Sequence, residues 1–350
     1  METIRLTTAE AIVRYLIAQK SAMLDGVAFG RDNAVEPLFP GVFAIFGHGN
    51  VTCLGHALEQ HQDDLPTWRG QNEQGMALAA TAYAKTVRRR QIMVATSSVG
   101  PGATNMVTAA GVAHSNRIPL LLIAGDTFAS RLPDPVLQQV EHFGEPSTTV
   151  NDAFRSVTRY WDRIMKPEQV LSSLPHAVQT MLDPSDCGPA FIGLPQDVAA
   201  EAYDFPVRFF DEQVHTIARP RADVVQLSSA AVAIEVAEKP LIIAGGGVHY
   251  SFAETELAAF AETHNIPVVE TVAGKASLLA LHPMYAGPIG VTGCEAANNL
   301  AAEADVVVAV GTRLEDFTTG SWTVFKNENV KIVGAVMSAS ISSKRTAKEA

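Results

Sequence analysis

Glu73 is the residue of this chain best placed for proton chemistry. It lies in residues 70–77, which read GQNEQGMA, and alanines are frequent from there to residue 87. Small side chains at this density predict a helix over residues 73–87 that packs closely against its neighbours. Glu73 either caps the N–H groups of the first helical turn, or forms a partly buried acid that exchanges a proton with a ligand.

Two glycine-rich turns are the second feature with chemical potential. Residues 97–105 read SSVGPGATN and follow an apolar segment at 92–96, while residues 47–50 read GHGN and follow an apolar segment at 42–46. A sharp turn into a helix presents backbone N–H groups to a ligand. Open α/β sheets bind ligands beyond the carboxyl ends of their strands. We therefore expect Glu73 and the turn at 97–105 to line one cleft.

Short apolar strands that alternate with helices must position these residues. Strands are expected at 42–46, 92–96, 118–124 and 191–195, and a helix capped at Thr7 precedes them. This order predicts an α/β fold, a doubly wound parallel sheet.

A second unit repeats the alternation and predicts a Rossmann-like α/β domain. Its expected strands cover 241–244, 266–270 and 306–310, and its expected helices cover 226–238, 252–264 and 295–303. The predicted organisation is a first domain at 1–198, a linker at 199–225, an incomplete central domain at 226–333 and a disordered tail at 334–350.

Composition narrows the classes of partner. The chain has 26 Lys and Arg against 37 Asp and Glu, a formal net charge of −11, which disfavours nucleic acid. The basic run Arg88-Arg89-Arg90 is interpreted as a solvated helix end. No apolar run reaches the ~20 residues of a membrane span, and no signal peptide is recognised. Three cysteines without a CxxC pair fit buried residues in a reducing compartment. We expect a cytoplasmic protein without membrane partners.

Two other motifs do not persist on inspection. Residues 245–250 (GGGVHY) begin like a dinucleotide-binding turn, but Tyr250 stands where a third small residue is required. His56 and His61 are five residues apart, on different faces of a helix, so they do not form a zinc site. No metal-ligating residues are assigned.

The glutamate and the turns together resemble those of the thiamine-diphosphate (ThDP) enzyme superfamily that includes acetolactate synthase. The resemblance rests on residues 72–75 (NEQG) and 96–105 (TSSVGPGATN) and extends over residues 1–333. Further segments are similar to the trihydroxycyclohexane-1,2-dione hydrolase family of myo-inositol catabolism. These are FGHGN at 46–50, GDTFA at 125–129, DPVLQQ at 134–139, NDAFR at 151–155, YWDR at 160–163, GTR at 311–313 and DFTT at 316–319.

The resemblance implies a cofactor, a substrate and residue roles. It implies ThDP with Mg²⁺, and a polyhydroxylated cyclic diketone whose ring is opened by C–C cleavage to 5-deoxyglucuronate. Glu73 would hydrogen-bond the aminopyrimidine ring, and His48 would be an acid/base or hydroxyl ligand unless it only shapes its turn. The remaining site residues implied are Gly100, Gly102 and Asn105 for the cofactor and Gln138 for the substrate. The active protein would be a homodimer or larger.

One departure from the superfamily pattern concerns the magnesium site. The family's Gly-Asp-Gly motif, which holds magnesium and the diphosphate in a third domain, is absent from this sequence. We therefore expect a truncated chain with two of three domains, whose cofactors both need the missing domain. An acetolactate-synthase-like carboligase and a non-catalytic remnant or assembly subunit remain as alternatives.

Overall fold

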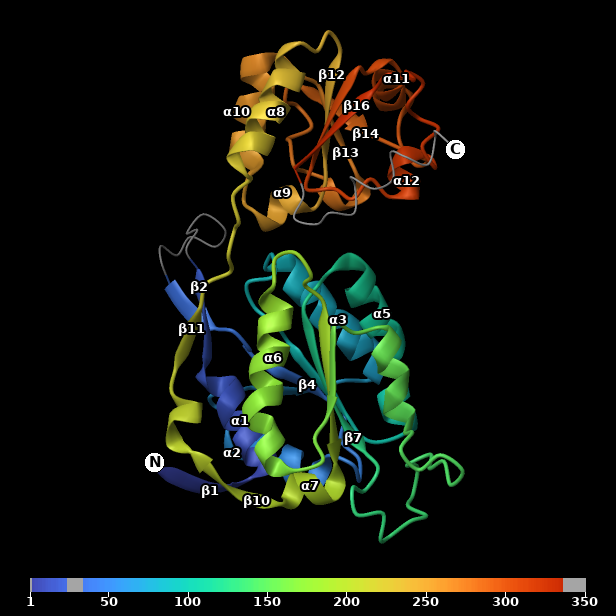
Figure 1. The fold of residues 1–350 in the computed structure, drawn as a ribbon. Helices are drawn as coiled ribbons and strands as arrows, with labels where there is room; N and C mark the ends of the chain where they lie inside the picture. Colours follow the sequence, from blue (N-terminus) through green and yellow to red (C-terminus); the bar gives the residue numbers. More distant parts are fainter. Residues whose placement is uncertain (1, 24–33, 336–350) are drawn as a thin grey trace. The chain divides into compact units, whose positions relative to one another are not determined.

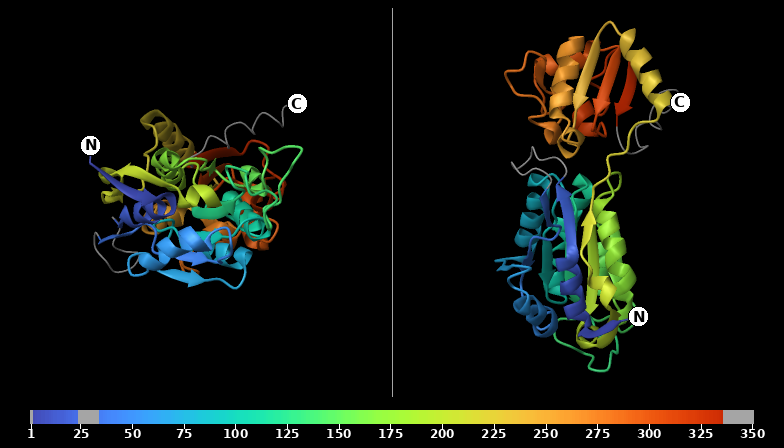
Figure 2. Two further views of the ribbon diagram at one scale, coloured as in Figure 1. Left: turned by 90° about the horizontal axis from the view of Figure 1, so that it is seen from below. Right: turned by 90° about the vertical axis from the view of Figure 1, so that its left-hand side faces the viewer.

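The computed structural model describes residues 2–23 and 34–335, and the chain divides into two compact units, Met1–Ala218 and Arg219–Ala350. Each unit contains a parallel sheet with helices on both faces (Figures 1 and 2). The α/β class predicted from the alternation of strands and helices is therefore confirmed.

The main sheet of the first unit has the order β5-β4-β6-β7-β9-β8, and all its strand pairs are parallel. The strands are β4 (Val42–Ala44), β5 (Thr67–Arg69), β6 (Val94–Ser97), β7 (Leu120–Asp126), β8 (Tyr160–Arg163) and β9 (Pro189–Pro195). After β4 the chain adds β5 on one side and β6 on the other. The strand order therefore reverses between β4 and β6, and ligands of such sheets bind at this switch point.

Helices cover both faces of this sheet (Figure 1). One face packs on α3 (Glu73–Thr86) and α5 (Val107–Asn116). The other packs on α1 (Thr8–Ala18), α2 (His56–Gln60), α6 (Val170–Leu182) and α7 (Gln196–Ala200), which share one apolar core with alternate strand residues. The predicted cap of α1 is confirmed, because the Thr7 hydroxyl accepts from the Glu10 amide at 3.2 Å.

Much of the predicted linker is part of the first unit. Strand β10 (Ala202–Pro206) pairs with β1 (Thr3–Thr7), and β11 (Gln213–His215) joins a small sheet with β2 (Gln19–Met23) and β3 (Ala34–Pro37). Phe205 is fully buried, and Phe209 of the short helix η4 (Val207–Phe210) stacks on Tyr15. These strands pair with segments far away in the sequence, so no local pattern announced them.

The second unit has the strand order β14-β13-β12-β15-β16, again all parallel. Its strands are β12 (Pro240–Ala244), β13 (Val268–Glu270), β14 (Tyr285–Pro288), β15 (Val306–Val310) and β16 (Lys331–Ala335). Alternate strand residues face opposite cores, one containing α10 (Glu254–His264) and the other α11 (Glu295–Glu303). Its other helices are α8 (Val224–Glu235), α9 (Gly247–Tyr250) and α12 (Asp316–Thr319). The predicted tail lies outside the described residues, except that Gly334 and Ala335 end β16.

The basic run at residues 88–90 lies just after the end of α3. The interpretation of Arg88-Arg89-Arg90 as a solvated helix end is wrong, because Arg90 is buried and the two preceding arginines have φ angles of 54° and 65°. The run forms the tight return from α3 to the buried strand β6.

Among the described residues, no helix is long and apolar enough to cross a membrane.

Candidate active site

Three loops meet at the carboxyl ends of β4, β6 and β7, at the switch point of the first sheet. Val99 is buried where they cross. A Cβ on Gly49 would lie 2.4 Å from Val99 Cγ1, and one on Gly125 would lie 2.7 Å from the same atom. The Gly49 amide also donates to Ser98 Oγ at 3.1 Å. Gly49 in the first turn and Gly125 near the end of β7 thus leave space for Val99, and the turns at 47–50 and 97–105 lie against each other.

Glu73 is the first residue of α3 and is half-buried. Asn72 caps the helix, since its side-chain oxygen accepts from the Gly75 amide at 2.8 Å. Glu73 Oε2 accepts from Asn105 Nδ2 at 2.8 Å, while a Cβ on Gly102 would lie 3.3 Å from Oε1. In the described part of the chain no group donates to Oε1. Because Asn72 performs the capping, Glu73 is available for another role.

The three predicted cofactor residues lie on the turn that faces Glu73. Gly100 precedes the short helix α4 (Pro101–Thr104) with a φ of 61°, and Asn105 ends that helix. A Cβ on Gly100 would lie 1.8 Å from the Gln138 carbonyl oxygen, so both the φ angle and the close approach require glycine here. Gly102 and Asn105 are brought against Glu73, whereas Gly100 packs against the segment that contains Gln138.

His48 is half-buried in the first turn and is held through both its ring and its backbone. Its Nε2 lies 2.6 Å from the Leu137 carbonyl oxygen, and its own carbonyl accepts from Gln196 Nε2 at 2.6 Å. A carbonyl oxygen only accepts, so Nε2 must carry the hydrogen. In the neutral ring Nδ1 is then the atom that accepts a proton.

Gln138 approaches the site through its backbone. Its side chain is exposed, its φ is 59°, and its carbonyl oxygen packs against Gly100. Among the described residues no hydrogen bond joins its side chain to Glu73 or His48. The next residue, Gln139, is buried, and its side-chain oxygen accepts from the Phe128 amide at 3.3 Å.

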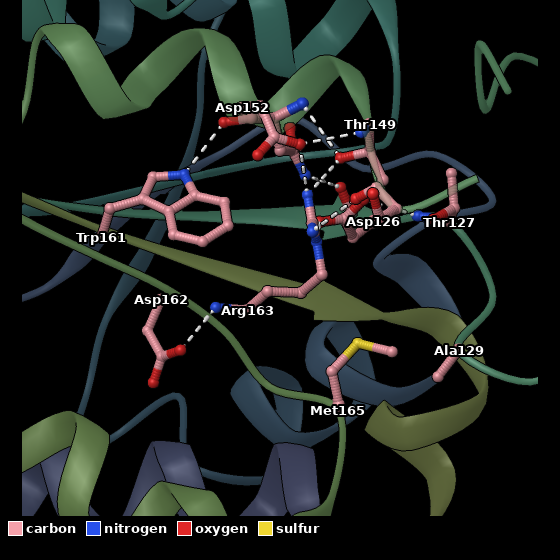
Figure 3. A network of polar contacts seen from close by, with 12 residues as sticks. Asp126, Thr127, Ala129, Thr149, Asp152, Trp161, Asp162, Arg163 and Met165 are labelled. Atoms are coloured by element: carbon pink, nitrogen blue, oxygen red, sulfur yellow. Dashed lines mark hydrogen bonds and ion pairs between the residues drawn. The ribbon is translucent and has the colours of Figure 1, made fainter. Parts of the chain in front are cut away.

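An ion-pair network beside these loops was not foreseen from the sequence. Asp126 at the end of β7 pairs with Arg163 at the end of β8, with 2.8 Å between Oδ2 and Nε (Figure 3). Arg163 also pairs with Asp152, with 2.7 Å between Nη2 and Oδ2. The segments GDTFA, NDAFR and YWDR contain these residues, but only the fold brings them together.

The structure contains no evident metal site in the part that it describes. No group of three or more His, Cys, Asp or Glu side chains there is arranged to hold a metal ion. His61, one of the two histidines considered for zinc, has its Nε2 2.9 Å from Glu10 Oε1 instead.

The glycine-rich turn of the second unit, at residues 245–247, packs against the backbone around Gly311. A Cβ on Gly245 would lie 2.5 Å from the Gly311 carbonyl oxygen, which accepts from the Gly247 amide at 2.9 Å. Glu270, at the position expected of a ribose-binding acid, is buried and accepts from the Leu278 amide at 3.1 Å. Gly245 and Gly247 thus pack closely against Gly311, a contact within the protein that accounts for their small size, and Tyr250 stands where a dinucleotide-binding turn has a third small residue.

Comparison with known families defines the class of protein. Residues 40–145 match the N-terminal TPP binding domain of thiamine pyrophosphate enzymes, and residues 227–349 match the central domain of these enzymes. The chain therefore belongs to the thiamine pyrophosphate (ThDP) enzymes, as the resemblance at residues 72–75 and 96–105 implied. The central-domain match continues past residue 333, where that domain was expected to end.

Individual relatives show which of these enzymes the chain resembles in sequence. The chain is 49% identical over 333 residues to 3D-(3,5/4)-trihydroxycyclohexane-1,2-dione hydrolase 1 of Bacillus cereus, an alignment that covers 95% of this chain and 50% of the relative. It is 49% identical over 330 residues to the 3D-(3,5/4)-trihydroxycyclohexane-1,2-dione hydrolase of Geobacillus thermodenitrificans, covering 94% of this chain and 50% of that relative. The chain thus spans about half the length of the curated relatives it matches.

Proposed function

We propose that this chain supplies the pyrimidine-binding and central domains of a ThDP-dependent C–C hydrolase. Its substrate would be 3D-(3,5/4)-trihydroxycyclohexane-1,2-dione, opened to 5-deoxyglucuronate in myo-inositol catabolism. The observation that carries the proposal is the geometry of Glu73. Asn105 holds one carboxylate oxygen, and the other faces Gly102 at the switch point of the sheet.

The residues around Glu73 fit the aminopyrimidine ring of ThDP. A side chain at position 102 would contact Oε1, so glycine there leaves the oxygen accessible to a flat ring. Glu73 would share a proton with the ring nitrogen, and Gly100 and Asn105 would shape the same wall. When bound, ThDP supplies an acceptor for the electron pair of the broken C–C bond.

His48 and Gln138 would serve the substrate. With its hydrogen on Nε2, the His48 ring would take a proton from a substrate hydroxyl at Nδ1. Gln138 would contact the substrate from the segment that packs on Gly100. The proposal for His48 is supported by its place at the switch point, and that for Gln138 by its neighbourhood alone.

Magnesium and the diphosphate would be held by another part of the enzyme. Magnesium binds through carboxylates and phosphate oxygens, and the described residues form no group of the required kind. We assign both to the half of the relatives' length that this chain does not span. The proposal includes a homodimer or larger assembly and a cytoplasmic location.

A fusion tests this proposal. The chain would be joined to the remaining half of the Geobacillus thermodenitrificans hydrolase and assayed with ThDP, Mg²⁺ and the cyclic diketone. We expect ring opening, and no consumption of pyruvate. Pyruvate turnover by the fusion would instead identify a carboligase. An inactive but folded fusion, together with co-purification of the chain with a full-length homologue, would identify an assembly subunit.

A further inference from the structure

The segment between β7 and the short helix η2 (Val150–Ser156) forms one side of the candidate site. Within the described residues it contains no helix or strand. We call residues 127–148 the site loop. Its Leu137 carbonyl accepts from the His48 ring, and its Gln138 carbonyl packs on Gly100. The path of the site loop therefore decides what lies against both glycine-rich turns.

Arg163 joins the two ends of the site loop. At the start, Asp126 accepts from Arg163 Nε through Oδ2 and from the Thr127 amide through Oδ1, both at 2.8 Å. At the end, Asp152 Oδ2 accepts from Arg163 Nη2 at 2.7 Å and from the Thr149 amide at 2.8 Å. Arg163 Nη2 also donates to Thr149 Oγ1 at 2.7 Å (Figure 3). One guanidinium thus orients both carboxylates that hold the two ends.

The sheet is built to admit this ion pair. Strand β9 lies between β7 and β8, so Arg163 must reach Asp126 across it. The residue of β9 opposite Arg163 is Gly193, where a Cβ would lie 2.8 Å from Asp126 Oδ2. Glycine at this position leaves the space that the Asp126 carboxylate occupies.

The Asp126–Arg163 ion pair is buried, so each charge depends on its partner. The Asp126 side chain is 1% exposed and that of Arg163 is 13% exposed. Burial would lower the pKa of Arg163, but Asp126 and Asp152 raise it above its ordinary value, so the guanidinium stays charged. Removing one member leaves a buried charge without its partner, which is strongly unfavourable. The site loop's ends therefore depend on Arg163.

We infer that Arg163 is a positioning residue that acts through the site loop on His48. By holding both ends of the loop it keeps the Leu137 carbonyl on Nε2, and thereby reserves Nδ1 for proton transfer. The catalytic use of Nδ1 rests on the proposed function, whereas the link from Arg163 to the His48 ring does not. Asp197 adds a second anchor, since it accepts from the Ala129 and Ser130 amides at 2.9 Å.

Arg155 offers a matched control. Its guanidinium lies 3.5 Å from the centre of the Trp161 ring and pairs with Asp152 Oδ1 at 2.7 Å. Arg163 lies over the same ring at 5.0 Å and pairs with the same aspartate. Among the described residues, however, Arg155 contacts neither Asp126 nor Thr149. Its substitution removes a similar interaction without releasing the start of the site loop.

The test follows the His48 tautomer by NMR in the 350-residue chain labelled with ¹⁵N-histidine, with His48 assigned from His48→Gln. Amide hydrogen exchange of Thr127 and Thr149 is measured in parallel. In Arg163→Met we expect both amides to exchange about tenfold faster and the His48 signals to show a mixture of tautomers. Arg155→Met should leave the His48 tautomer and the Thr127 amide unchanged.

A second variant keeps the test decisive if Arg163→Met does not fold. Arg163→Lys retains the charge beside Asp126 but lacks the fork that reaches two carboxylates, so the Thr149 amide should still exchange faster. An unchanged His48 tautomer in folded Arg163 variants would overturn the inference, as would an equal change in Arg155→Met. Neither ThDP nor substrate is used, so failure here is distinct from failure of the proposed function.

Discussion

At the level of single residues, the division of labour between Asn72 and Glu73 decides how the candidate site is organised. Asn72 takes the capping amide of Gly75, and Asn105 fixes one oxygen of Glu73. A carboxylate next to a cap still benefits from the positive end of the helix dipole. Glu73 is therefore oriented by Asn105 without being required to cap the helix.

Glu73→Gln tests this separation of roles. In the active fusion we expect kcat to fall by roughly 10²–10⁴-fold, because an amide cannot share a proton with a ring nitrogen as a carboxylate does. The melting temperature should change little, since Asn72 remains the cap. Asn72→Ala is the converse control, with a lower melting temperature and a smaller effect on kcat. Unchanged turnover in Glu73→Gln would reduce Glu73 to a structural residue.

Asp197 should make the start of the site loop sensitive to acid. Burial would raise the pKa of Asp197. Hydrogen bonds from the Ser130 and Ala129 amides, and then from the Ser130 side chain and the Val198 amide, lower this pKa below its ordinary value. A carboxylate with a lowered pKa stabilises the folded form when ionised. That stabilisation is present above about pH 4, near the unfolded pKa, and is lost as the pH falls further through the folded pKa.

Amide exchange can check this pH dependence. Protection factors of Ala129 and Ser130 should be constant from about pH 7 to about pH 5 and fall below about pH 4. Asp197→Asn should show weaker protection at neutral pH and a smaller fall in acid. Protection that is independent of pH in the unchanged chain would contradict the role given to Asp197.

At the level of elements, the crossing of the three loops should be intolerant of added volume. A Cβ on Gly49 would lie 2.4 Å from Val99 Cγ1 and 2.7 Å from the Val99 amide nitrogen. Because one of these atoms belongs to the backbone, no rotamer change relieves the clash. We expect Gly49→Ala to lower the free energy of unfolding by about 1–3 kcal/mol in urea titrations.

Gly144→Ala is the matched control for that measurement. A Cβ at position 144 would have nothing within 4 Å, so we expect a change within about 0.5 kcal/mol. Equal stability of the two variants would mean that the crossing is looser than the distances indicate.

Elements with a strong local signal were predictable from the sequence. The expected helix at 295–303 and strand at 306–310 coincide with α11 and β15. The strands that were missed lie at sheet edges or depend on partners. In β5, Thr67-Trp68-Arg69 is partly exposed, and β14 contains Gly287 and Pro288, which are typical of turns. Such strands are defined by what they pair with.

In the candidate site, too, residues in short sequence motifs could be singled out, whereas contacts between distant segments could not. Glu73, His48 and Gly100 lie in short motifs, and in the structure they lie near the switch point, while their roles stay predictions. Asp126 and Arg163 are 37 residues apart and meet only because Gly193 opens the intervening strand. Their partnership depends on the order of strands in the sheet, which no local pattern contains.

At the level of the whole molecule, we expect the negative net charge and the lack of metal-ligating residues in the described part of the chain to limit cofactor binding. Its formal net charge is −11, its sequence has no Gly-Asp-Gly motif, and the described residues form no acidic metal site. A diphosphate with magnesium therefore finds little to bind here. We expect calorimetry to detect no binding of ThDP with Mg²⁺ at micromolar concentrations.

Thiamine without phosphates is the control for this measurement. Since only the pyrimidine part has a partner in Glu73, ThDP should bind no more tightly than thiamine. A micromolar dissociation constant that requires Mg²⁺ would show that the chain holds the diphosphate after all, and would contradict the assignment of that role to another part of the enzyme.

The fixed ends of the site loop have a consequence for how substrate preference can change. Arg163 holds Asp126, Thr149 and Asp152 at the two ends of the site loop, so we expect the residues between them to be exchangeable as one segment, a cassette. We expect changes in its length and composition to leave the register of β7, β8 and β9 unaltered. The cassette faces His48 and Gly100 but leaves Glu73 with Asn105. If the proposed roles of His48 and Gln138 hold, we expect a grafted cassette to change which molecules bind at the site and to leave the Glu73–Asn105 hydrogen bond intact.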